Sequence, residues 1–391
     1  MSETSAAAPP PRPQGRAVFV DVRRGSMFRV ARALKKYGVE TVAWMGYAGS
    51  LDRVLEEHPG CEVYDYWRFN KGASLLLRGS TATAPREILA SAEFRALKEK
   101  TIKMMDRHDV AGMFRYPDRE ALFYSLFFYF WDRMSALKPT LLVSVHSPHL
   151  PGPMVLLGVC ALLGARTVHV REVPQAELTY LATDFKDGFL PTVSDQDAKT
   201  SRITDLTDYV SRFETLDYGA IEPSYMKAQR AADKAGPPVD GHTPMTGFGH
   251  YRKLKRGINL AAPPQRASSY RVTSADFMED RPRVRFRVED GQSEAEARLA
   301  YKLAVRDLQQ FEYDRISVTP NLARKYVYFP LHYEPEKTSN PDGGDYFNVF
   351  EAVAALRAFL PMNVAIYVKE HYTQLSPRMS GFRGRSAYLY R

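Results

Sequence analysis

The stretch that decides the fold runs from Lys325 to Gln374 and reads KYVYFPLHYEPEKTSNPDGGDYFNVFEAVAALRAFLPMNVAIYVKEHYTQ. Two short runs rich in β-branched and aromatic residues, Tyr326–Phe329 and Val364–Val368, predict strands. Apolar residues recur at helical spacing over Phe347–Phe359, which predicts an amphipathic helix. A strand, a helix and a strand in this order form a βαβ unit, whose two strands are expected to pair in parallel.

Each of these two strands is followed directly by polar residues. His332, Glu334 and Glu336 follow the first strand, and Lys369 and His371 follow the second. In α/β sheets, ligands bind beyond the carboxyl ends of the strands. A lysine point charge beside a directional histidine suits a nucleotide phosphate, and the carboxylates suit sugar or ribose hydroxyls. A solvated surface turn is the alternative interpretation of the same residues.

Two glycines, Gly343 and Gly344, come just before the helix of this unit. Glycines at a helix N-terminus let a phosphate approach the backbone N–H groups closely. They are equally typical of a plain turn, so this pattern alone decides nothing.

A second βαβ unit is predicted earlier in the chain. Its strands are Leu141–Val145 and Thr167–Val170, and its helix is Met154–Leu163. Polar residues again follow both strands: His146, Ser147, His149, Arg171 and Glu172. The two halves of the chain therefore share one architecture, which predicts two Rossmann-like domains facing each other.

The chain opens with a predicted strand at Arg16–Val22, a helix at Met27–Tyr37 and a strand at Glu40–Trp44. This order is Rossmann-like, but the glycine fingerprint of dinucleotide-binding folds is absent, which argues against a nicotinamide cofactor. The further segments expected before the second βαβ unit are a helix at Leu51–Glu57, a strand at Cys61–Trp67, helical structure at Pro85–Met105 and a long helix at Arg119–Leu137. The aromatic middle of that long helix is expected to pack in the core.

The predicted fold class is therefore α/β, divided into four parts. They are a disordered leader at 1–15, an N-terminal Rossmann-like domain at 16–200, a helical and basic connecting region at 201–320, and a C-terminal Rossmann-like domain at 321–391. The last part holds too few strands to cover both faces of a sheet. We therefore expect it to be incomplete: either the chain is a fragment or truncated product, or a partner completes the fold.

Composition narrows the class of protein. The chain has 391 residues, two cysteines and a formal net charge of +9. Two unpatterned cysteines form neither a disulfide scaffold nor a cysteine-based zinc site, and the N-terminus does not read as a secretory signal. The positive charge favours anionic sugar nucleotides or an anionic membrane surface as partners. No nucleic-acid-binding motif accompanies it, so nucleic acid is not an expected partner.

The blocks YFPLHYEPE (328–336) and IYVKEH (366–371), with the Gly-Gly-led helix between them, resemble the capsule polysaccharide biosynthesis protein family. That family consists of bacterial glycosyltransferases with a GT-B-like pair of Rossmann domains. The resemblance covers only about fifty residues, the stretch at 325–374 that opens this section. It places the nucleotide-sugar donor at the C-terminal polar residues, with the phosphate near Lys369 and His371. Tyr372 stands where the family usually has proline, and a CMP-linked acidic sugar such as Kdo is one possible donor.

The resemblance leaves a glycan or lipid-linked acceptor to the first domain, near His149 and Arg171. Glycosyl transfer needs a base for the acceptor hydroxyl, or a carboxylate nucleophile if configuration is retained. We expect Glu172 or His146 in that role, with Asp184 as the next choice. Asp187 is a further carboxylate in the same segment.

No metal and no other cofactor is expected, because His146 with His149 lacks a third ligand. The expected compartment is the cytoplasm, with peripheral contact at the inner membrane or the export machinery as an open alternative. Two other functions remain in view. One is a GT-B-like UDP-sugar epimerase, which would act on the nucleotide sugar alone, and the other is a non-catalytic scaffold or truncated member of an assembly complex.

Overall fold

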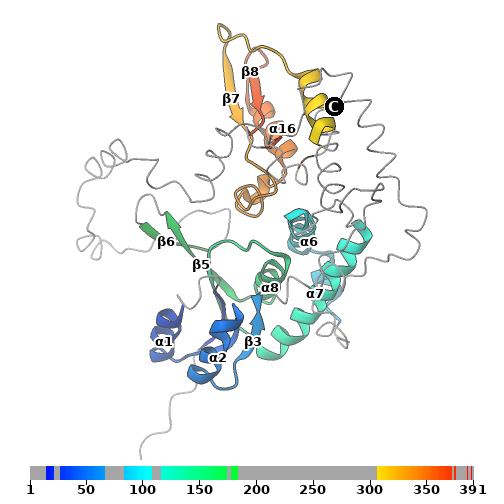
Figure 1. Ribbon diagram of the computed structural model, residues 1–391. Coiled ribbons are helices and arrows are strands. Elements are labelled where there is room, and N and C mark those ends of the chain that lie inside the picture. The colour runs from blue at the N-terminus through cyan, green and yellow to red at the C-terminus, as the bar shows by residue number, and fades with distance from the viewer. Residues whose placement is uncertain are drawn as a thin grey trace, which may run out of the picture.

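A computed structural model describes residues 15–21, 27–66, 83–107, 116–173, 178–183, 306–371, 374–375, 385 and 389. Figure 1 shows two parts, an α/β part with a larger sheet and a smaller βαβ part above it. We call residues 15–183 the N-terminal unit and residues 306–389 the C-terminal unit.

The N-terminal unit is built on a six-stranded sheet with the order β3-β2-β1-β4-β5-β6. Its strands are β1 (Gly15–Asp21), β2 (Val39–Gly46), β3 (Glu62–Asp65), β4 (Leu141–Val145), β5 (Arg166–Val173) and β6 (Leu178–Ala182). Neighbouring strands pair in parallel except β5 and β6, which pair antiparallel. The sheet is therefore mixed but mostly parallel, as the sequence predicts for a Rossmann-like fold.

Helices cover both faces of this sheet (Figure 1). They are α1 (Phe28–Lys36), α2 (Ala48–Glu57), α5 (Arg86–Ala90), α6 (Ala92–Met104), the 3-10 helix η1 (Met105–Arg107), α7 (Tyr116–Leu137) and α8 (Pro151–Leu162). Side chains of α1 and α2 pack in one core and those of α6, α7 and α8 in another, each with residues of the sheet. Because β1 lies between β2 and β4, the chain order reverses there, which is the switch point of doubly wound sheets.

Aromatic side chains fill both cores. Trp44 of β2 is fully buried and stacks on Phe19 and Phe28, with ring centroids 4.7 and 5.0 Å away. On the other face, Phe127 of α7 lies 4.8 Å from the ring of Phe94 on α6. The aromatic middle of α7 is thus core, which confirms the prediction and fixes α6 against the sheet.

The two cysteines lie in these cores rather than at the surface. Cys61 precedes β3 and Cys160 lies on α8, and both are buried free thiols. Burial raises the pKa of Cys160, and burial together with Glu62 and Glu40 raises that of Cys61 to about 12. Burial therefore disfavours the reactive thiolate form of both side chains.

The C-terminal unit contains a single βαβ motif within its described residues. Its elements are β7 (Tyr326–Pro330), the 3-10 helix η4 (Gly344–Tyr346), α16 (Val349–Phe359) and β8 (Ala365–Lys369). β7 and β8 pair in parallel over all five residues. The helix begins where Asn348 caps it, accepting a hydrogen bond from the Phe350 N–H at 3.1 Å. A further helix at 306–316 is joined to this unit by Gln309, whose side chain donates to the Arg385 carbonyl at 2.5 Å.

The strands and helices expected for both βαβ motifs are confirmed to within a few residues. Helix α8 begins three residues earlier than predicted because Leu150 is extended and Pro151 opens the helix, and β5 ends three residues later than predicted. β6 was not predicted. The leader at 1–14, Asp184, Asp187 and most of the connecting region lie outside the described residues. None of the described helices is both long and apolar enough to cross a membrane.

Candidate functional site

The predicted polar residues of the C-terminal unit lie side by side beyond β7 and β8. Pro330 pairs with Lys369, and the Leu331 N–H donates to the Lys369 carbonyl at 2.8 Å. This pairing continues past the last strand residue and so keeps His332 close to His371. Parallel pairing thus brings together two polar ends that are about forty residues apart in the sequence.

His371 is half-buried, and its ring lies 6.0 Å from that of Tyr333. Burial lowers its pKa below the ordinary value, His332 and Arg385 lower it further, and Glu370 opposes them. The imidazole is therefore neutral at neutral pH. A neutral imidazole still has one N–H donor. His371 would therefore bind a phosphate through one directional hydrogen bond, and Lys369 would bind it through its positive charge.

This environment predicts a pH dependence of stability. Because the pKa of His371 is lower in the folded state than in the unfolded state, folding favours the neutral form. The stabilisation is present above the unfolded pKa, about 6.5, and is lost as the pH falls through it toward the folded value. Urea unfolding between pH 8 and pH 5 should show this loss, and His371→Asn should reduce the slope. An unchanged slope in His371→Asn would rule out His371 as its source.

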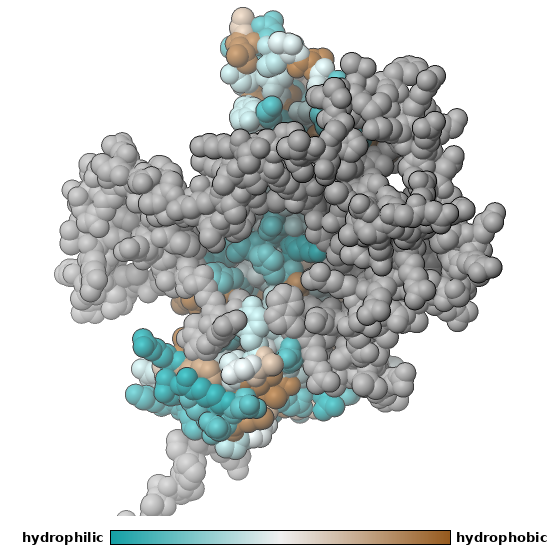
Figure 2. Space-filling view, in the orientation of Figure 1, coloured by the Kyte–Doolittle hydropathy of each residue, from teal (hydrophilic) through white to brown (hydrophobic). Residues whose placement is uncertain are grey.

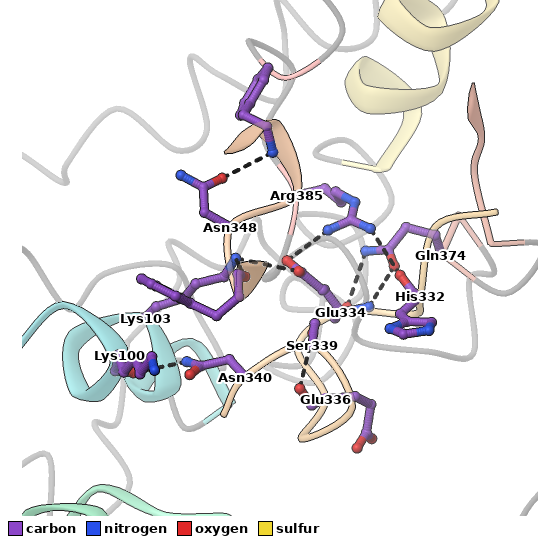
Figure 3. A network of polar contacts seen from close by, with 12 residues as sticks. Lys100, Lys103, His332, Glu334, Glu336, Ser339, Asn340, Asn348, Gln374 and Arg385 are labelled. Atoms are coloured by element: carbon purple, nitrogen blue, oxygen red, sulfur yellow. Dashed lines mark hydrogen bonds and ion pairs between the residues drawn. The ribbon is translucent and has the colours of Figure 1, made fainter. Parts of the chain in front are cut away.

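Glu334 lies in a buried ion network, shown in Figure 3. Its carboxylate pairs with Arg385 at 2.7 Å and with Lys103 of α6 at 3.4 Å. Arg385 also pairs with Glu370 at 3.1 Å. Burial by itself lowers the pKa of Arg385, but the two carboxylates outweigh burial and raise it. Glu334 thus already has two cationic partners, so this network fixes the loop after β7.

Hydrogen bonds to the backbone hold the same loop. Gln374 pairs with the Glu334 backbone, accepting from its N–H at 2.9 Å and donating to its carbonyl at 3.1 Å. Arg385 donates to the carbonyl of His332 at 2.9 Å. The loop between β7 and α16, residues 331–348, is therefore tied to the chain that follows β8. We call it the 331–348 loop.

Helix α6 of the N-terminal unit binds the 331–348 loop. Lys103 donates to the Phe347 carbonyl at 2.8 Å, and the Asn340 side chain donates to the Lys100 carbonyl at 2.8 Å (Figure 3). The ammonium groups of Lys100 and Lys103 also lie 5.5 and 5.7 Å from the Phe347 ring centroid. Two lysines one turn apart on α6 thus make cation–π contacts with the same aromatic residue of the loop.

Arg107, on η1, joins the same loop to the segment after β4. Its guanidinium donates to the His149 carbonyl at 2.8 Å and to the Asn340 carbonyl. Burial lowers the pKa of Arg107 to about 10, although Glu336 and Asp342 raise it. Arg107 remains charged at neutral pH and adds positive potential where the two units meet.

The polar residues predicted at the ends of β4 and β5 face the 331–348 loop directly. Arg171 pairs with Asp342 at 2.6 Å, and His149 lies 3.8 Å from Glu336. The Ser147 hydroxyl also donates to Asp342. The predicted acceptor residues and the predicted donor residue Glu336 thus lie in one contact region. Figure 2 shows hydrophilic surface between the two units.

His146 has an unusual backbone conformation. It directly follows β4 and has a φ of 63°, a left-handed conformation that few residues other than glycine adopt. The backbone around it is pinned, because its N–H donates to the Val170 carbonyl at 3.0 Å and its carbonyl accepts from Ser144 at 2.7 Å. Backbone strain of this kind is concentrated at functional sites.

The predicted glycines have a purely structural explanation. Gly344 has a φ of 58°, and a Cβ on Gly343 would lie 2.5 Å from the Ser339 carbonyl oxygen. Both positions therefore require glycine for the backbone to turn into α16. Of the predicted catalytic carboxylates, Glu172 lies on β5, with its side chain outside the described part of the structure.

A cavity of about 480 Å³ lies between β7, the 331–348 loop and α16. Its walls are mostly apolar, with Phe329 and Leu356 among them, and its polar side is formed by His332, Glu334 and Arg385. The volume and the mixture of lining residues are typical of small-molecule sites. Within the described residues, no group of three or more His, Cys, Asp or Glu side chains is placed to hold a metal ion.

The residues of this region that were not among the predicted site residues include Arg107, Ser147, Asp342 and Arg385. Asp342 sits in a Pro-Asp-Gly-Gly run that reads as an ordinary turn, and the two arginines lie among many basic residues. Of these four residues, Ser147 alone carries a signal in the sequence, since it lies two residues after a predicted strand. The partners of the other three are distant in sequence, so local patterns could not identify them.

Scans of protein-family models, curated proteins and solved structures found no match to this chain. The family named above from sequence motifs therefore stays a prediction.

Proposed function

We propose that this protein is a glycosyltransferase of bacterial capsule or surface-polysaccharide assembly, with a GT-B-like pair of domains and a nucleotide-sugar donor. One observation carries the proposal: the polar ends of the two parallel sheets meet. His149 and Arg171 beyond β4 and on β5 contact Glu336 and Asp342 beyond β7. In α/β enzymes such sheet ends are where ligands bind.

The donor would occupy the C-terminal unit. Its phosphate would lie at Lys369 and His371, and the flat face of its nucleobase would pack on the apolar walls of the cavity beside His332 and Glu334. A CMP-linked acidic sugar such as Kdo suits the net charge of +9. No step requires a metal or another cofactor.

The acceptor would lie against the N-terminal unit near His149 and Arg171. We assign the base to His146, because backbone strain of the kind it shows is concentrated at functional sites. Glu172 and Asp184 are the carboxylate alternatives. The base would take the proton of the acceptor hydroxyl while its oxygen attacks the anomeric carbon. The nucleotide would leave with the electron pair of the broken bond, its charge balanced by Lys369. The expected compartment is the cytoplasm, with peripheral contact at the inner membrane.

The double variant Lys369→Ala with His371→Ala tests the donor site. Loss of a charged and a neutral hydrogen bond to phosphate should weaken binding of CMP- and UDP-sugars about 10-fold or more. Isothermal titration calorimetry measures this effect. Lys36→Ala, on the exposed surface of α1, is the control for the loss of one positive charge. Equal affinity of the double variant and the parent would remove the donor site from these residues.

A scaffold without catalysis is the second candidate. It is favoured by one observation, namely that Glu334 and Arg171 are already engaged in ion pairs within the chain. A scaffold would show neither nucleotide-sugar binding nor transfer. An epimerase would convert a UDP-sugar with no acceptor present, whereas a transferase would need both substrates.

A further inference from the structure

The contact between Arg171, Ser147 and Asp342 has the form of an occupied anion site. One carboxylate oxygen, Oδ1 of Asp342, accepts from Arg171 Nη2 at 2.6 Å and from the Ser147 hydroxyl. Arg171 Nη2 also donates to Ser147 Oγ at 2.7 Å. The two donors therefore support each other and converge on a single oxygen.

The two donors belong to the N-terminal unit, and their positions are fixed by its sheet. Arg171 lies on β5, and Ser147 is buried two residues beyond β4, the strand that neighbours β5. Both strands run parallel here, with Val145 opposite Val170, so the donors lie at the edge where α/β sheets bind ligands. The guanidinium of Arg107 adds a further positive charge here. It lies close enough to Asp342 for this carboxylate to raise the pKa of Arg107.

The anion itself comes from the other unit. Asp342 belongs to a tight turn of the 331–348 loop, in which its N–H donates to the Lys337 carbonyl at 3.0 Å. Its side chain is about one-fifth exposed, as is that of Arg171. Asp342 is thus a carboxylate reached by solvent on a surface turn, set against donors that a rigid sheet holds in place. The pairing of β4 with β5, which positions the backbone of both donors, does not include Asp342.

We propose that Ser147 and Arg171 form a binding subsite for an oxyanion, the carboxylate or phosphate of a substrate, and that Asp342 occupies it as an internal ligand. An incoming anion displaces Asp342 and so removes the contact that Asp342 makes with the ends of β4 and β5. Assignment of that anion to the acceptor rests on the proposed function, whereas the anion chemistry does not. Asp342 then blocks the subsite until an anionic ligand displaces it.

Removal of the internal ligand provides the test. In the parent, an anion must compete with a tethered carboxylate, which lowers its apparent affinity by the fraction of molecules in which the subsite is open. Asp342→Ala should therefore bind inorganic phosphate or glucuronate at least 10-fold more tightly than the parent, measured by calorimetry. Adding Arg171→Gln to Asp342→Ala should abolish the gain. Comparing the two probes shows whether the subsite prefers a phosphate or a carboxylate.

Three controls keep the result interpretable. Asp314→Ala removes the same charge from an exposed site on the helix at 306–316 and should leave affinity unchanged. Neutral methyl glucoside should not bind at the subsite. Asp342→Asn keeps the size of the side chain and replaces Asp342→Ala if that variant does not fold.

The proposal is overturned if Asp342→Ala and Asp342→Asn bind both anions no better than the parent does, or if Asp314→Ala gives an equal gain. It is also overturned if the gain survives Arg171→Gln. The assay uses neither a nucleotide sugar nor turnover. Failure of the donor site at Lys369 and His371 would therefore leave this measurement untouched, and failure here would leave the donor test untouched.

Discussion

Arg385→Ala should lower the free energy of unfolding of the C-terminal unit by about 3–5 kcal/mol, since it leaves buried carboxylates without their cation. The Arg385 side chain is 2% exposed, and its partners Glu334 and Glu370 are 3% and 4% exposed. Lys103 stays beside Glu334 at 3.4 Å, whereas Glu370 loses the cation that lies 3.1 Å away and keeps a hydrogen bond from the His371 N–H at 2.7 Å. The loss should appear in urea unfolding and as faster hydrogen exchange in β7 and β8.

Two further variants show whether the stability loss in Arg385→Ala comes from buried charges left unpaired or from lost contact area. Arg315→Ala breaks an ion pair in which the arginine is 52% exposed, so it should cost less than about 1 kcal/mol. The triple variant Arg385→Met, Glu334→Gln and Glu370→Gln removes all three charges and should recover most of the loss. A cost below about 1 kcal/mol for Arg385→Ala would show that the network does not hold this unit together.

Phe127→Ala should lower the stability of the N-terminal unit by about 3–5 kcal/mol, the usual cost of emptying a buried aromatic site. Phe127 is fully buried between Phe94 of α6 and Trp131 of α7, with ring centroids 4.8 and 5.6 Å away. Because α6 carries the lysines that hold the 331–348 loop, the contact between the units should loosen as well. Scanning calorimetry measures the fall in Tm, at about 2–4 °C per kcal/mol for a unit of this size.

The matched control for this prediction lies on the same helix. Tyr116→Ala removes an aromatic side chain that is 56% exposed, so it should change stability by about 0.5 kcal/mol or less. Equal losses for Phe127→Ala and Tyr116→Ala would mean that α7 is not the centre of this core.

Local patterns in the sequence predicted the two βαβ motifs, because β-branched runs, helical spacing and turn residues act over a few residues. They placed His332, Lys369 and His371 together, and parallel pairing of β7 with β8 confirms that position. They also marked the ends of β4 and β5 as a place for polar chemistry. The same reasoning missed β6, a short strand whose antiparallel partner is known only once the sheet is formed.

Charge pairing could not be predicted in this way. Glu334 was expected to bind hydroxyl groups, and the structure gives it Arg385, fifty-one positions later, as an ion-pair partner. Arg171 and Asp342 are separated by 171 positions and meet only because two units pack together. Sequence patterns identify which side chains are polar, whereas their partners depend on the tertiary contacts.

The burial of both native thiols also makes the molecule suitable for site-directed spectroscopy. Thiolates attack thiol-labelling reagents, and Cys61 and Cys160 are protonated and shielded in the cores. New cysteines at exposed positions, such as Lys138 on the N-terminal unit and Met362 on the C-terminal unit, would therefore take up spin labels selectively. Electron paramagnetic resonance could then follow the separation of the units as an anion is added, with the natural cysteines left in place.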